Sequence, residues 1–149
     1  MEEIRTTFLT PHFTLDEMTV TETGLYNKPR SFAIANLKLL CKYVLEPTRL
    51  ALQYPIKIDS AYRSDQVNAK VKGAKNSQHL IGSAADFSCK DMKVAFEYIR
   101  THLQFDQLIW EFGTSEQPGW IHVSYSIFSN RMQVLKSRKI LGLTVYKSM

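Results

Sequence analysis

The chain has 149 residues, of which 44% are hydrophobic and 22% are charged, and its net charge is +5. The length favours one domain over residues 1–149, the composition argues against disorder, and two cysteines outside any CxxC pair argue against a disulfide scaffold or a zinc–thiolate site. The basic charge suits an anionic partner, but no lysine–arginine block specifies nucleic acid and no apolar run could span a bilayer.

The first half of the chain predicts two helices and a strand. Thr14–Glu17 has the pattern of a capping box, in which the threonine and glutamate bond each other's backbone N–H groups, and it opens a short helix. Apolar residues recur at helical spacing from Ser31 to Leu45, so one face of a long helix packs on the core. Pro47 then ends, kinks or restarts that helix. Ile56–Ser60 alternates between apolar and polar residues and predicts a strand.

The middle of the chain alternates short helices with loops and a strand. Residues 64–71 indicate a short helix, 73–78 a loop and 83–89 a strand. Asp91 can cap a helix that runs to about Leu103, with Val94, Tyr98 and Ile99 facing inward.

The last elements are expected to be strands. Residues 107–112 and 120–125 alternate, and the span between them contains Gly113 and Pro118, which predicts an antiparallel hairpin with a loose loop. A late strand, about Ile140 to Tyr146, closes the sheet. Helices mixed with hairpin-connected strands indicate an α+β fold, with a small antiparallel sheet flanked by helices.

Two histidines and one aspartate form the most informative set of residues. His79 and Asp86 stand seven positions apart, separated by small and apolar residues, and His122 lies on a later strand. Two imidazoles and one carboxylate hold zinc and leave a fourth position open for water, which is typical of a catalytic site. Gly82 and its small neighbours would let the backbone fold tightly around the metal. The same ligand set accepts other divalent ions.

Further residues supply the other parts of a hydrolytic site. If the hairpin places Glu111 on the face of His122, its carboxylate can act as the general base; Glu116, in the connecting loop, is the competing candidate. Arg63 directly follows a predicted strand and can bind a substrate carboxylate or a developing oxyanion. Ser77 and Gln78 can hydrogen-bond a substrate backbone. Each of these residues taken alone also fits a plain structural or solvated role.

The residues together resemble a known family, the zinc D-Ala-D-Ala carboxypeptidase family, which is peptidase family M15. The matching segments cover most of residues 13–125 and are Pro11–Thr19, Ser60–Ser64, Val67-Asn68, Gly73, Asn76–Phe87 and Trp120–Val123. The family contains carboxypeptidases, dipeptidases and L-alanyl-D-glutamate endopeptidases, and it shares its zinc fold with the hedgehog signalling domain.

The resemblance implies that the two histidines and the aspartate bind zinc and that Arg63 assists substrate or transition-state binding. The sequence departs from the family at one position, because many members carry the catalytic glutamate three residues before the last histidine and this chain has Gly119 there. The site glutamate of the hedgehog domain ends a strand written much like Leu108–Glu111, which favours Glu111.

The expected function is zinc-dependent hydrolysis of peptidoglycan stem peptides by a D,D-carboxypeptidase or an L,D-type endopeptidase. Met1–Arg5 lacks a secretory signal, so we expect a protein made in a cytoplasm that acts on the wall after release, as a phage or prophage endolysin does. We also expect a monomer. An intracellular recycling enzyme fits as well. The alternative from a different class is a non-catalytic, zinc-stabilised module that binds the cell wall or a protein.

The remaining basic and histidine residues receive plainer interpretations. A nucleic-acid surface from Arg131 to Lys147 is a third possibility, but its cations are scattered among apolar residues and favour a solvated face on a terminal strand. His12 and His102 lack supporting context, so we assign them to surface or packing roles.

Overall fold

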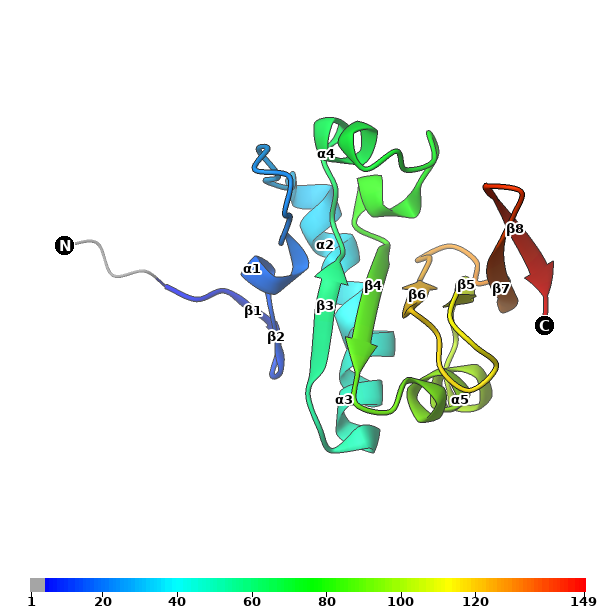
Figure 1. Cartoon of the computed structure of the whole chain (residues 1–149). Coiled ribbons are helices and arrows are strands. Elements are labelled where there is room, and N and C mark those ends of the chain that lie inside the picture. The colour runs from blue at the N-terminus through cyan, green and yellow to red at the C-terminus, as the bar shows by residue number, and fades with distance from the viewer. Residues whose placement is uncertain (1–4) are drawn as a thin grey trace.

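The computed structural model describes residues 5–149. Its main element is a six-stranded mixed sheet (Figure 1). The expectation drawn from Met1–Arg5 lies almost wholly outside these residues. The strands lie in the order β3-β4-β6-β5-β7-β8. Their bounds are β3 Ile56–Ser60, β4 Ala84–Cys89, β5 Gln107–Glu111, β6 Trp120–Ser124, β7 Gln133–Ile140 and β8 Leu143–Ser148.

The expectation of a mixed helix-and-sheet fold is met, but the small antiparallel sheet is matched only in part. The chain crosses from β6 to the far side of β5, where β7 pairs with β5 in parallel, while the other neighbours pair antiparallel. The single strand expected from about Ile140 to Tyr146 instead spans the end of β7, a turn and the first part of β8. Left-handed backbone at Leu141 and Gly142 (φ 49° and 79°) turns the chain between them.

The helical segments are α1 Leu15–Met18, α2 Ser31–Leu40, the π-helix η1 Cys41–Leu45, α3 Glu46–Leu52, α4 Asp65–Lys70, the 3-10 helix η2 Gln78–Ile81 and α5 Met92–His102. Most of the helical core residues come from α2, η1 and α5, which pack on one face of the sheet. A small sheet of β1 Phe8–Thr10 and β2 Phe13–Thr14 precedes them. Among residues 5–149, no helix is both long and apolar enough to cross a membrane.

Of the three outcomes offered for Pro47, the structure shows a restart: α3 begins directly after the π-helix η1. Pro47 stands in the first turn of α3, and the wide π turn of η1 directly precedes it. Proline has no N–H to donate to the carbonyl four residues earlier, so the α-helical pattern is interrupted here. The preceding π turn is closed by the Glu46 N–H, which donates to the Cys41 carbonyl. The capping box of Thr14 and Glu17 is present, and the Asp91 side chain accepts from the backbone N–H of Val94.

The helical face of the sheet holds the core, and the opposite face is open. Met92, Ala95, Phe96 and Ile99 are the buried residues of α5, whereas Val94, expected inward, is half exposed. On each strand the alternate residues point to the open face. Two rows of residues on neighbouring strands therefore lie on the open face. Asp86, His122 and Ile109 stand opposite one another in the first row, and Glu111, Ser137 and Tyr146 do so in the second.

Candidate metal centre

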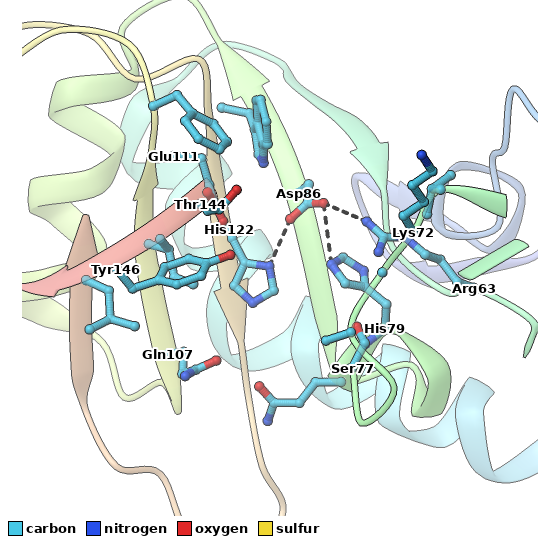
Figure 2. Close-up of a pocket in the computed structure, with 18 of the residues that line it drawn as sticks. Arg63, Lys72, Ser77, His79, Asp86, Gln107, Glu111, His122, Thr144 and Tyr146 are labelled. Atoms are coloured by element: carbon cyan, nitrogen blue, oxygen red, sulfur yellow. Dashed lines mark hydrogen bonds and ion pairs between the residues drawn. The ribbon is translucent and has the colours of Figure 1, made fainter. Parts of the chain in front are cut away.

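Strand pairing aligns two of the three expected donors. Asp86 of β4 stands opposite His122 of β6, and His122 stands opposite Ile109 of β5. The Asp86 Oδ1 atom lies 2.9 Å from His122 Nδ1. The carboxylate therefore sits in the middle of the donor group, between two imidazoles from opposite sides (Figure 2).

His79 reaches the same point from η2. The Ser77 side chain caps this short helix by accepting from the His79 N–H, and Gly82 ends it in the left-handed conformation (φ 75°). A Cβ atom on Gly82 would lie 2.4 Å from the carbonyl oxygen of Ala33 in α2. Gly82 is thus required by its left-handed backbone and by its close contact with α2, which packs η2 against the fold.

The donor atoms fit a zinc ion. One ligand atom from each of His79, Asp86 and His122 lies within 4.8 Å of the others. The Ala61 carbonyl oxygen lies 2.6 Å from His79 Nδ1 and can only accept, so Nδ1 carries the proton and Nε2 offers its lone pair. This Nε2 lies 3.4 Å from Asp86 Oδ2. Two ligands of a tetrahedral zinc are about 3.3 Å apart, given bonds of about 2.0–2.1 Å.

Electrostatics favours the ligand forms of these side chains. Burial raises the pKa of the Asp86 carboxyl, but His79 and His122 outweigh it and hold that pKa well below its usual range. Burial also lowers the pKa of His79, against the opposing effect of Asp86. An ionised carboxylate and a neutral imidazole are the states that bind a metal.

Arg63 lies beside the donors, and most of its N–H groups bond other side chains of the protein. Its Nη2 donates to Asp86 Oδ2 at 3.0 Å and its Nε donates to Ser60 Oγ at 3.0 Å, with a longer contact of 3.5 Å to Asn68. A guanidinium has five N–H donors, so two remain for a substrate group. Arg63 therefore orients Asp86 in addition to lining the cleft.

Glu111 lies on the same face of the sheet as His122, the placement that the strand pattern made a condition for its role. It ends β5, pairs with Trp120 in register and is 7% exposed on the open face. The backbone N–H of Gly119 donates to the Glu111 carbonyl at 2.8 Å, so the hairpin brings this carboxylate next to the position that holds a glutamate in many family members. Burial raises the pKa of Glu111, and hydrogen bonding from Ser137 opposes that rise.

The other candidate base and the two remaining histidines lie outside the cleft. Glu116 is exposed and pairs with Lys93 of α5 at 2.7 Å, and it is not among the residues that line the cleft. His12 bonds Glu46, and His102 stacks on Tyr98 at the end of α5. Both histidines thus have the surface and packing contacts expected of them.

The two expected substrate-binding residues line the cleft and also support the fold. Ser77 is the cap of η2, and the Gln78 Nε2 donates to Asp106 Oδ2 at 2.8 Å. Asp106 also accepts from the Nε and Nη2 of Arg131, at 2.9 and 2.8 Å. This network joins η2 to the segment that leads into β7.

The cleft around the donors has a volume of about 730 Å³, and part of its wall was not expected from the sequence. The β7–β8 hairpin contributes the residues Leu135, Lys139, Thr144 and Tyr146, and the Tyr146 side chain extends into the cleft (Figure 2). Lys72 and Gln107 line it as well. No motif marks these residues, because only the parallel pairing of β7 with β5 brings the hairpin to the site.

Two imidazoles, one carboxylate and a nearby glutamate at a cleft are the parts of a zinc-type peptidase site. The comparison with protein families agrees: a model described as Peptidase M15 matches residues 11–124. The chain belongs to peptidase family M15, as the resemblance predicted, and this family consists of metallopeptidases. No curated protein matches the chain. The family match ends before β7, so the last hairpin lies outside it.

Proposed function

We propose that residues 1–149 form one zinc-dependent peptidase domain that hydrolyses bonds in peptidoglycan stem peptides. The observation that carries this proposal is the convergence of His79, Asp86 and His122 in a cleft where Glu111 shares the open face. Zinc held by these three donors would supply an activated water and polarise the scissile carbonyl.

The protein residues have separate roles in this proposal. Glu111 accepts a proton from the attacking water and passes it to the leaving amine. Arg63 holds Asp86 in place, and its two remaining N–H groups bind a substrate carboxylate or the developing oxyanion. Ser77 and Gln78 line the cleft next to His79, where their polar groups meet the peptide backbone.

Cationic residues in the cleft favour an anionic peptide. Arg63, Lys72, Arg131 and Lys139 line it, and the whole chain carries a net charge of +5. Stem peptides carry free carboxylates that such a lining attracts. The D,D-carboxypeptidase and the L,D-type endopeptidase reactions both fit this surface, as does action on the wall by a monomeric endolysin after release from the cell.

Digestion of purified peptidoglycan tests the proposal. The protein is incubated with zinc or with a chelator, and the soluble fragments are analysed by mass spectrometry. We expect zinc-dependent release of fragments whose masses name one stem-peptide bond. The matched control is Glu111→Gln, which keeps the donors and should lower kcat by about 10² to 10⁴.

Two outcomes would contradict the proposal. Fragments that appear equally in the chelated protein would exclude a metal-dependent reaction. A zinc-loaded protein that binds the wall but releases no fragment would instead support a non-catalytic, zinc-stabilised binding module. Unchanged turnover by Glu111→Gln would show that Glu111 is not the general base, and it would leave the rest of the proposal standing.

A further inference from the structure

Ser137 of β7 is a fully buried polar residue that lies beyond the family match and beyond every motif in the sequence. We propose that Ser137 is a positioning residue that fixes the carboxylate of Glu111 for proton transfer. This inference rests on the proposed function, because it assigns Glu111 the role of general base.

Strand pairing places the two side chains together. Ser137 stands opposite Glu111 in the parallel β5–β7 pair, and both residues lie on the open face of the sheet. Their exposed fractions are 0% and 7%. A hydrogen bond between them is therefore shielded from competing water, where it is strongest.

The direction of the hydrogen bond follows from the neighbours of Ser137. The backbone N–H of Phe112 lies 3.2 Å from both the carbonyl oxygen and the Oγ of Ser137. It can only donate, so the hydroxyl oxygen accepts a share of this hydrogen bond. Its own hydrogen is then directed at Glu111 Oε2, to which it donates. A hydroxyl that is held from both sides cannot rotate away from the carboxylate.

The consequence is that the two carboxylate oxygens of Glu111 differ. Oε2 accepts from Ser137, whereas Oε1 makes no hydrogen bond within residues 5–149. Because Glu111 lines the cleft, Oε1 is the oxygen left to take a proton from water or give one to a leaving amine. The serine thus selects one carboxylate rotamer and one reactive oxygen.

Ser137→Ala tests the role, with stem-peptide hydrolysis by the zinc-loaded protein as the first readout. We expect kcat to fall about ten-fold, as the loss of one buried hydrogen bond to a charged group implies, with KM and zinc content unchanged. Ser137→Thr, which keeps the hydroxyl, should recover most of the activity. Ser88→Ala is the matched control, because it removes another serine–carboxylate bond on the same sheet, to Asp59, outside the cleft.

The second readout does not need activity. The pKa of Glu111 is measured by NMR on protein with ¹³C-labelled glutamate, and Glu111→Gln assigns the signal. Loss of a donor to the charged form should raise this pKa in Ser137→Ala and leave it unchanged in Ser88→Ala. If Ser137→Ala does not fold, Ser137→Cys keeps nearly the same volume with a weak donor and replaces it in both measurements.

The outcomes separate the two proposals. A folded Ser137→Ala protein with wild-type kcat and an unchanged Glu111 pKa overturns the positioning role. A wild-type protein that cleaves no stem peptide overturns the proposed function, and the NMR titration then still decides whether Ser137 holds the Glu111 carboxylate.

Discussion

Glu111 carries its charge at a buried position, and this has a consequence for stability. Burial raises the pKa of the carboxyl, so the folded, metal-free protein holds this proton more tightly than the unfolded chain does. Stability therefore falls as pH rises from the ordinary glutamate value, about 4.3, through the raised value. We expect Glu111→Gln to increase the free energy of unfolding at pH 7, as measured by urea denaturation of metal-free protein.

The same pair of proteins provides the check on this expectation. Below pH 4 the carboxyl is neutral in both states, so wild type and Glu111→Gln should unfold at nearly the same urea concentration. A difference that stays constant between pH 3.5 and pH 7 would show that the charge of Glu111 is not its cause.

Gly82 combines a left-handed backbone with a close contact. Alanine at this position meets the strain of φ 75° and also a Cβ contact of 2.4 Å with the Ala33 carbonyl. We expect Gly82→Ala to destabilise the protein by about 2–4 kcal/mol, the sum of a backbone term of about 1 kcal/mol and an overpacking term of about 1–3 kcal/mol.

Gly24 is the matched control for Gly82→Ala. Its φ is 72°, and a Cβ atom there would meet nothing within 4 Å. Gly24→Ala should therefore show the backbone term alone, as measured by thermal or urea unfolding. Equal losses of unfolding free energy in Gly24→Ala and Gly82→Ala would mean that the close contact with α2 adds nothing to the cost at Gly82. The site would then owe its placement of His79 to other contacts of η2.

Between elements, Asp106 is the main polar connection of η2 to the start of β7. The Arg131 side chain donates to both of its oxygens and lowers the pKa of the Asp106 carboxyl to about 2. A lowered pKa in the folded state stabilises the protein above the unfolded value, and this contribution is lost as pH falls toward 2. We expect Arg131→Ala to cost about 1–3 kcal/mol at pH 7, as charge-assisted hydrogen bonds do.

Urea unfolding of wild type and Arg131→Ala across pH 7 to pH 2.5 measures this connection. The difference in unfolding free energy between the two proteins should narrow below about pH 4, where the Asp106 carboxyl takes up a proton in the unfolded chain while folded wild type still holds it ionised. Arg138→Ala, which removes an exposed arginine of β7 outside the cleft, is the control and should change stability little. A difference that does not depend on pH would point to lost packing of Arg131 instead.

The elements that the sequence predicted well are those with one buried face. Ile56–Ser60 and Trp120–Tyr125 alternate because one side packs on helices, and the capped helices carry their signals within a few residues. β7 escaped prediction because Val134 and Leu135 are adjacent and most of its side chains are partly exposed, which blurs the period of two. The parallel partner of β5 is a long-range choice that no local pattern records.

The residues of the candidate site also fall into those that the sequence indicated and one that it did not. His79, Asp86, His122 and Glu111 could be found because donor types and strand faces restrict them strongly. Ser137 could not, since a lone serine on a strand has many plainer explanations and its partner is known only once the β5–β7 register is known.

For the molecule as a whole, zinc should act as a stabilising ligand. A metal that binds the folded chain and not the unfolded one adds about 2.7 kcal/mol at a free concentration of 100 Kd. We expect zinc to raise Tm in a concentration-dependent way and a chelator to reverse it. Asp86→Asn, which leaves the central position without a charge, should abolish most of this rise.

The Ser88→Ala variant should keep the full zinc-dependent rise in Tm, because Ser88 lies on the same strand outside the cleft. A zinc response that is equal in wild type and Asp86→Asn would place the binding site at other residues.

The position of β5 between β6 and β7 also sets an order of assembly. Both neighbours of β5 come later in the chain, and a protein emerges from the ribosome from its N-terminus. All three candidate donors have emerged once His122 has, but β7 must still cross over and pair before Glu111 gains its partner. A nascent chain can therefore bring the three candidate donors together before Glu111 has its hydrogen-bond partner, and pairing of the last hairpin then fixes that carboxylate.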